Sequence, residues 1–273
     1  MKVERLLNAL LISIGNELLS GKTINTNATY LAKNLTNLGF VVKKIITVPD
    51  DPEIVPIEIS HALLSNDYRI ILITGGLGPT WDDSTAFFLS KALGVDTELN
   101  AKALSIVTQR YQVLFNKKLV ETSEITPARK KMAILPVNAD PIDNPVGTAP
   151  GIFFNHKDSN TWIFCLPGVP REMKAMYLLI ESEIMALIKE KHMSYYETEF
   201  TSSFTDESLL APFLIRVRQK YDVWIKSLPE AYQEEKNIRL IISKSADSEV
   251  DAKKEVMDAK AYLQKLLDLS HNS

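Results

Sequence analysis

Residues 70–85 constrain this chain more than any other segment. They begin with the apolar run Ile-Ile-Leu-Ile at 70–73, in which three residues are β-branched. Such a run predicts a strand buried on both faces, as in the parallel sheets of α/β proteins. Glycine follows at Gly75, Gly76 and Gly78, and a turn without Cβ atoms lets backbone N–H groups approach an anion closely. Because ligands of open α/β sheets bind at the carboxyl ends of the strands, we expect a binding site directly after this strand.

Two acidic residues follow the glycine turn. Asp82 and Asp83 lie at the start of a helix expected over residues 83–93, and Thr80 or Asp82 is positioned to cap its N-terminus. The helix dipole favours a phosphate at this end, but two carboxylates would repel it unless a divalent cation lay between them. The pair therefore indicates Mg²⁺ or a similar hard ion. An isolated Asp-Asp pair more often serves the helix dipole alone, and the glycine turn on a buried strand reverses this preference in favour of the metal site.

Composition excludes several classes of protein. The 31 basic and 34 acidic residues nearly balance, which argues against a general polyanion-binding surface. The single cysteine, Cys165, lies in an apolar run and is expected to be a buried, inert thiol. No stretch approaches the roughly 20 apolar residues that cross a bilayer, so we expect a cytoplasmic protein without a membrane partner.

Apolar periodicity predicts alternating strands and helices over residues 1–190, which is typical of a doubly wound, mostly parallel α/β sheet. Residues 135–151, rich in proline and asparagine, are expected to form an irregular loop at the edge of the site. The expected strands are 10–14, 41–48 and 70–73, with a hairpin of 152–154 and 161–166, and the expected helices are 25–38, 53–64, 83–93, 101–115, 127–132 and 170–189.

The pattern changes near residues 190–194, where we place a domain boundary. Residues 194–273 predict a small α+β domain in the order strand, helix, strand, strand, helix. This domain contains no Gly-x-x-Gly loop of the kind that grips nucleic acid, so nucleic-acid binding is not expected.

The segment from Gly15 to Thr23 has some features of a phosphate-binding P-loop. Five residues separate Gly15 from Gly21, however, where the P-loop requires four. We expect a substrate loop instead, in which Glu17 faces the site as a ligand-orienting or metal-linked carboxylate. Asn25 and Asn27 then offer amides to a ribose or phosphate, and the alternative that Asn25 only caps a helix stays open.

Two other residues leave alternatives open. Arg171 either reaches a phosphate with its planar guanidinium group or only covers the start of a helix. Trp81 is able to stack on a ring of the ligand, but packing against the following helix is the expectation.

Five segments together resemble the competence/damage-inducible protein CinA. Residues 74–85 read Thr-Gly-Gly-Leu-Gly-Pro-Thr-x-Asp-Asp-x-Thr, which is similar to a CinA signature and to the turn of the wider MoaB/MogA/MoeA molybdopterin-binding superfamily. The resemblance covers the chain up to about residue 190. The other similar segments are 16–21, 25–27, 144–151 and 166–174.

The resemblance implies a three-layer, molybdopterin-binding-like fold and a KH-like second domain. It also implies a nucleotide slot walled by the turns at Gly147 and Thr148 and at Pro167 and Gly168. Metal-assisted chemistry is implied at Asp83 ahead of Asp82, with a divalent metal as cofactor and a monovalent cation left open. The resemblance also implies a homo-oligomer, with a dimer favoured. We do not expect the nicotinamide mononucleotide deamidase domain that many CinA proteins carry.

The leading functional hypothesis is an ADP-ribose pyrophosphatase that hydrolyses ADP-ribose to AMP and ribose 5-phosphate. Asp83, Asp82 and Glu17 are its expected catalytic residues, and FAD or a pterin are the alternative ligands. A second hypothesis is a molybdopterin-binding or adenylylating protein of molybdenum cofactor biosynthesis. A third is a non-catalytic nucleotide-binding module, against which the intact acidic pair argues.

Overall fold

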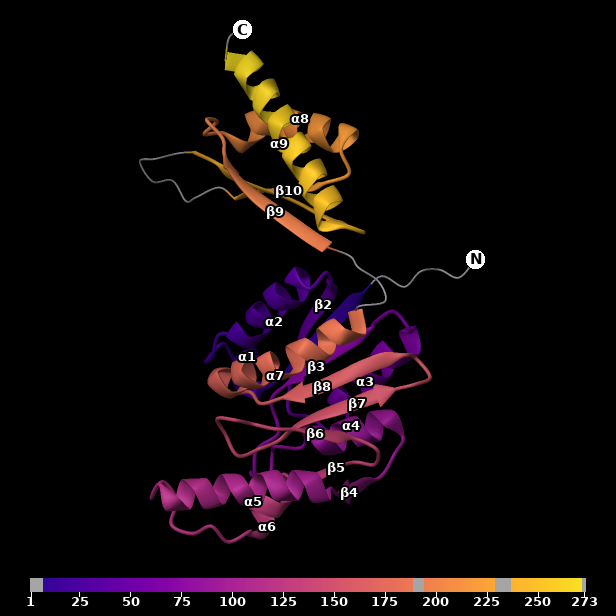
Figure 1. The fold of residues 1–273 in the computed structure, drawn as a ribbon, viewed down its shortest axis with the longest axis vertical. Helices are drawn as coiled ribbons and strands as arrows, with labels where there is room; N and C mark the ends of the chain where they lie inside the picture. Colours follow the sequence, from indigo (N-terminus) through magenta and orange to yellow (C-terminus); the bar gives the residue numbers. More distant parts are fainter. Residues whose placement is uncertain (1–6, 189–193, 229–236, 272–273) are drawn as a thin grey trace. The chain divides into compact units, whose positions relative to one another are not determined.

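The computed structural model describes residues 7–188, 194–228 and 237–271, and the chain divides into two units between Leu187 and Ile188. Each unit has a β-sheet of its own (Figure 1). The expected α/β fold with a small second domain is confirmed. Residues 189–193, near the expected boundary, lie outside the described residues.

A six-stranded sheet organises the first unit, in the order β2-β1-β3-β8-β7-β6. The first four strands in this order are parallel, and the β7 and β6 edge is antiparallel. The strands are β1 (Asn8–Ile14), β2 (Val41–Val48), β3 (Ile70–Thr74), β6 (Asp140–Ile142), β7 (Gly151–His156) and β8 (Thr161–Leu166).

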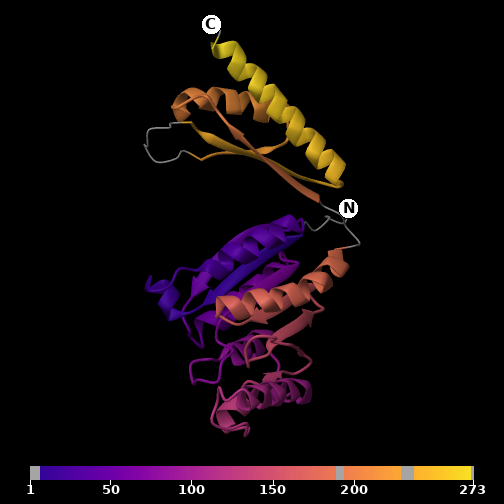
Figure 2. The ribbon, with the colours of Figure 1, turned by 60° about the vertical axis from the view of Figure 1, so that its left-hand side comes forward.

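Helices cover both faces of this sheet. On one face, α3 and α4 contact each other and pack against Leu10, Ile12 and Ile14 of β1. Because successive strand residues point to opposite faces, the sheet has a second face to cover. Figures 1 and 2 show α2 and α7 side by side over this second face. The helices are α1 (Asn16–Leu19), α2 (Thr26–Asn37), α3 (Ile54–Ser65), α4 (Thr85–Leu93), α5 (Ala101–Asn116), α6 (Pro127–Lys131) and α7 (Pro170–Ile188).

Strand β3 lies at the centre of the core. It is hydrogen-bonded to β1 on one side and β8 on the other, and the four residues from Ile70 to Ile73 are completely buried. Burial on both faces explains why the sequence here is continuously apolar. On the adjacent strand, Cys165 is also buried, and burial raises the pKa of its thiol, as expected for an inert side chain.

Three local predictions were wrong. Helix α4 begins at Thr85, with Ser84 at the N-cap and no side-chain capping bond, so neither Thr80 nor Asp82 caps it. Residues 16–19, part of the segment expected to be a substrate loop, form the single-turn helix α1. Residues 135–151, expected to form an irregular loop, include the end of β5 (Ile134–Pro136) and the whole of β6. Strand β5 pairs with β4 (Thr97–Leu99). Strands of three residues are too short to carry a periodic signal.

The second unit contains the antiparallel sheet β10-β11-β9, with α8 and α9 packed on it. Leu210, Leu240, Ile242 and Leu263 are buried in its separate core. Its elements are β9 (Ser194–Thr201), α8 (Glu207–Lys220), β10 (Trp224–Leu228), β11 (Arg239–Ala246) and α9 (Glu249–His271). In the part of the chain that the structure describes, no helix is both long and apolar enough to cross a membrane.

We expect Ile73→Ala to lower the free energy of unfolding of the first unit by about 2–5 kcal/mol, because it opens a cavity in a strand buried on both faces. Ile45→Ala is the matched control, since Ile45 lies in parallel strand β2 but is 48 % exposed, and it should cost no more than about 1 kcal/mol. Urea denaturation measures both. Equal losses would contradict the central position of β3 in the core.

Candidate functional site

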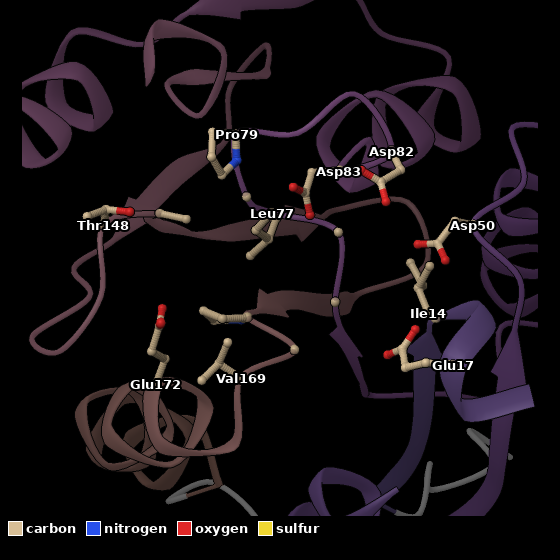
Figure 3. Close-up of a pocket in the computed structure, with 17 residues that line it drawn as sticks. Ile14, Glu17, Asp50, Leu77, Pro79, Asp82, Asp83, Thr148, Val169 and Glu172 are labelled. Atoms are coloured by element: carbon tan, nitrogen blue, oxygen red, sulfur yellow. The ribbon is translucent and has the colours of Figure 1, made fainter. Parts of the chain in front are cut away.

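A cavity of about 500 Å³ opens where β1, β3 and β8 end (Figure 3). The three strands are parallel and in register, so the segments that follow them meet at one edge of the sheet. Gly75, which follows β3, donates its N–H to the carbonyl of Leu166 at the end of β8 at 3.0 Å. Gly15, which follows β1, donates its N–H to the carbonyl of Val48 at the end of the neighbouring β2 at 3.1 Å. Ligands of open α/β sheets bind in this position.

The glycine turn after β3 forms one wall of the cavity. Gly75 and Gly76 have φ angles of +107° and +65°. A Cβ atom at Gly75 would overlap the Ile14 carbonyl oxygen, and one at Gly76 would overlap the Thr85 hydroxyl. Thr85 also fastens the turn, because its hydroxyl donates to the Gly75 carbonyl at 2.7 Å and its N–H to the Gly76 carbonyl at 3.0 Å.

The turn leaves backbone donors for a ligand. Within the described part of the chain, the N–H groups of Gly76, Leu77 and Gly78 have no hydrogen-bond acceptor. All three residues line the cavity. Successive N–H groups of this kind form a concave site that binds anions.

The acidic loop is held by Thr80. Its hydroxyl oxygen lies 2.5 Å from a carboxylate oxygen of Asp82 and 2.6 Å from one of Asp83, and its N–H donates to Asp83 at 2.9 Å. The Thr80 hydroxyl lowers the pKa of the Asp82 carboxyl, and the Lys131 ammonium lowers it further. Lys131 also donates to the Thr80 carbonyl from α6, a contact that the sequence did not reveal.

Glu17 and Asp50 lie near this loop in the cavity (Figure 3). Asp50 accepts a hydrogen bond from the Asn16 N–H at 3.0 Å. Burial raises the pKa of the Asp50 carboxyl; the Asn16 bond lowers it, and the carboxylates of Glu17 and Asp82 raise it further. Sequence reasoning missed Asp50, although it follows β2, a parallel strand whose carboxyl end lies at the same edge of the sheet.

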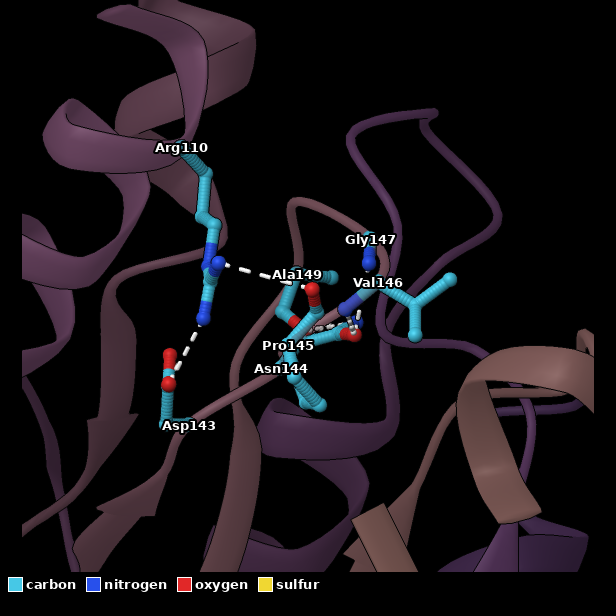
Figure 4. Close-up of polar contacts among 7 residues, drawn as sticks. All are labelled: Arg110, Asp143, Asn144, Pro145, Val146, Gly147 and Ala149. Atoms are coloured by element: carbon cyan, nitrogen blue, oxygen red, sulfur yellow. Dashed lines mark hydrogen bonds and ion pairs between the residues drawn. The ribbon is translucent and has the colours of Figure 1, made fainter. Parts of the chain in front are cut away.

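The opposite wall depends on a buried asparagine. Asn144 donates to the Ala149 carbonyl at 2.9 Å and accepts from the Gly147 N–H at 2.7 Å (Figure 4). It also donates to the Glu172 carboxylate at 2.7 Å. A Cβ atom at Gly147 would overlap the Glu172 carboxylate. Asn144 thereby fixes the segment that carries Thr148, and it holds Glu172, which sequence reasoning missed, at the cavity.

The cavity is strongly acidic. Its lining includes the carboxylates of Glu17, Asp50, Asp82, Asp83 and Glu172, and none of the described residues that line it is Lys, Arg or His. A diphosphate therefore needs a cation to enter, since like charges repel at short range.

A divalent ion fits these residues. Among the described side chains, no group of three or more His, Cys, Asp or Glu is arranged to hold a metal by itself. Mg²⁺ does not require such a group, because it keeps several waters and binds one or two carboxylates together with substrate phosphates. Asp82 and Asp83, gathered around one hydroxyl, provide two hard oxygen ligands of this type.

Nine of the predicted site residues line the cavity: Glu17, Gly75, Gly76, Gly78, Asp82, Asp83, Thr148, Pro167 and Gly168. The other five, Asn25, Asn27, Thr80, Gly147 and Arg171, do not line it. Thr80 and Gly147 act behind the wall, through the acidic loop and the Asn144 turn.

The remaining three residues have other surroundings. Asn25 caps α2 by accepting a hydrogen bond from the Ala28 N–H at 3.1 Å. The structure therefore shows the helix-capping alternative for this residue. Asn27 is buried and donates to the Gly168 carbonyl at 2.8 Å, which supports the cavity wall from behind. Arg171 is exposed in the first turn of α7.

Trp81 does not pack against the following helix, so that expectation was wrong. Its side chain is 90 % exposed, because α4 begins only at Thr85 and residue 81 lies in the loop before it. The Ser84 hydroxyl donates to the Trp81 carbonyl at 3.4 Å, which fixes the backbone of the loop and leaves the ring outside.

Residues 10–186 match the family model described as "Probable molybdopterin binding domain". The chain belongs to this family. Protein SSO0103 of Saccharolobus solfataricus is 40% identical to this family member over 82% of the present chain and 78% of its own. A protein of Sulfurisphaera tokodaii is 38% identical over 94% of this chain and 93% of its own, so that similarity extends into the second unit.

A solved structure, "the protein CinA with unknown function" of Thermoplasma acidophilum, is 35% identical to this family member, with a TM-score of 0.59. The match covers 66% of this chain and 99% of that one. The expected resemblance to the CinA N-terminal domain is confirmed.

We expect Gly76→Ala to destabilise the first unit more than Gly94→Ala does. Gly94 has a φ of +66°, nearly equal to that of Gly76, but a Cβ atom there meets nothing within 4 Å. Both variants therefore carry the left-handed backbone cost of about 1–2 kcal/mol, and only Gly76→Ala adds the overlap with Thr85, about 1–3 kcal/mol more. Chemical denaturation measures the difference, and equal stabilities would show that the glycine is not required for close packing.

Proposed function

We propose that this protein is a divalent-metal-dependent hydrolase of a nucleotide diphosphate linkage, with ADP-ribose as the first substrate to test. The observation that carries this proposal is the cavity itself. It combines five carboxylates and no lining basic side chain with backbone N–H groups that have no acceptor in the described chain. Carboxylates attract cations, whereas backbone N–H groups attract anions. The combination therefore suits an anionic ligand that binds together with a cation.

The residues divide the chemistry between them. Asp83 and Asp82 would hold the divalent ion, and Glu17 is the third candidate ligand from the adjacent wall. When bound, such an ion supplies positive charge that neutralises the diphosphate oxygens, and it makes a bound water a stronger nucleophile. The N–H groups of Gly76, Leu77 and Gly78 bind phosphate oxygens in a turn whose geometry is already fixed, so little reorganisation is needed.

In the proposed reaction, the oxygen of water bonds to one phosphorus of the diphosphate. The bond from that phosphorus to the bridging oxygen breaks, and the departing phosphate leaves with the bridging oxygen and the electron pair of that bond. The protons of the attacking water pass to the solvent or to the product phosphates. ADP-ribose and water thus give AMP and ribose 5-phosphate. The resemblance to CinA suggests this substrate, and a cavity of about 500 Å³ lies within the usual range of small-molecule sites.

We expect Asp83→Asn to reduce release of AMP from ADP-ribose roughly 100-fold or more, since the amide removes a charge from the site of phosphoryl transfer. Asp158→Asn is the matched control, because Asp158 is an exposed acid in the same unit that does not line the cavity. Chromatographic assay of AMP measures both. Undiminished turnover by Asp83→Asn would remove this residue from the mechanism.

Removal of divalent ions with EDTA is expected to abolish AMP release, and added Mg²⁺ to restore it. Asp82→Asn should then raise the Mg²⁺ concentration required for half-maximal activity, because it removes one of two neighbouring hard ligands. Full activity in EDTA would refute the metal-dependent mechanism.

A second candidate function is binding of a pterin, which the description of the family as a probable molybdopterin binding domain favours. Isothermal titration of the protein with ADP-ribose, FAD and a pterin, each with Mg²⁺, ranks the ligands. Tightest binding of the pterin, without turnover of ADP-ribose, would replace the hydrolase proposal with this one.

A further inference from the structure

A second cavity, of about 210 Å³, adjoins the acidic cavity. Gly76, Leu77, Gly78 and Asp83 line both cavities, so the glycine turn and the acidic loop form a shared wall. The segment that includes Thr148 and Ala149 at the acidic cavity continues to Pro150 at the second one. A ligand that binds at the shared wall is therefore within reach of both.

The second cavity has a different chemical character. Eight of the fourteen described residues that line it have apolar side chains: Leu77 of the shared wall, Ala86 and Phe87 of α4, Met132, Ile134 and Leu135 after α6, Pro150, and Ile152 of β7. Two of these, Phe87 and Ile134, are 55 % and 37 % exposed and so are accessible to a ligand. Apolar groups in this position gain free energy when a ligand removes them from water.

Lys131 is the only basic side chain among the described residues that line either cavity. Its ammonium donates to the Thr80 carbonyl, and its charge lowers the pKa of the Asp82 carboxyl. It therefore places a positive charge where the acidic loop meets the apolar cavity. A ligand with a negative phosphate beside an apolar ring matches this sequence of environments.

We propose that the second cavity binds the planar heteroaromatic ring of the ligand whose phosphates occupy the acidic cavity. This rests on the proposed function, which supplies the phosphate-bearing ligand. Adenine and pterin share the required chemistry, a flat ring with an apolar face. The Phe87 ring, held by an edge contact to Phe88 with centroids 6.4 Å apart, provides the surface for stacking. A water occupies about 30 Å³ in the liquid, so a cavity of 210 Å³ holds a group several waters in size.

The two products of the proposed reaction test this subsite without turnover. AMP carries an adenine ring and ribose 5-phosphate does not, and neither contains a diphosphate. We expect Phe87→Ala to raise the Kd of AMP about tenfold in the presence of Mg²⁺, because it removes the stacking surface. The Kd of ribose 5-phosphate should not change. Phe115→Ala is the matched control, since Phe115 is 43 % exposed on α5 and lines neither cavity.

Ile134→Ala removes an apolar group from another element of the same cavity and should also weaken AMP alone. Thermal unfolding of each variant confirms that it is folded; Phe87 is over half exposed, so little loss is expected. The same titrations with a pterin distinguish the source of the ring, and a rise in Kd for either ring compound supports the subsite. Equal affinities of Phe87→Ala and Phe115→Ala for both ring compounds would overturn it. Ring-dependent binding of AMP without hydrolysis of ADP-ribose would leave the subsite intact and refute only the hydrolase.

Discussion

The close approach of two backbones at the ends of β1 and β3 is the constraint on which the site depends. Gly75 lies against the Ile14 carbonyl with no room for a Cβ atom, and Thr85 ties the turn to the start of α4. The burial of β3 on both faces prevents the strand from shifting to relieve this contact. Packing and hydrogen bonds therefore hold the turn in one conformation before any ligand arrives.

Electrostatics follows from this fixed conformation. Carboxylates from separate segments, those of Glu17, Asp50, Asp83 and Glu172, are gathered at one cavity, and hydrogen bonds from Asn16, Thr80 and Asn144 hold three of them. Such a concentration of negative charge is unfavourable by itself. A structure that uses several hydrogen bonds to maintain it is typical of a site that binds a cation, and this is the physical basis of the proposed metal dependence.

The same loop also separates two environments. On one side it faces an acidic cavity and on the other an apolar one, with Lys131 near the boundary. A nucleotide or a pterin phosphate has this division within one molecule. The family match and the similarity to a CinA structure are consistent with a small-molecule site at this edge of the sheet. The two environments define how such a ligand would be oriented, with its phosphates in the acidic cavity and its ring in the apolar one.

Four features could be predicted from the sequence alone: the buried strand, the glycine turn, the acidic pair and the alternation of strands and helices that leads to a mostly parallel sheet. These features are local: a run of apolar residues or a cluster of glycines has the same meaning wherever the strand lies. Three-dimensional contacts were needed to show that Asp50, Glu172 and Lys131 lie beside these features. They also showed that Asn25 caps a helix and that Trp81 is exposed. Those outcomes depend on which strand ends and loops become neighbours, and contacts between residues far apart in the chain leave no periodic pattern in its sequence.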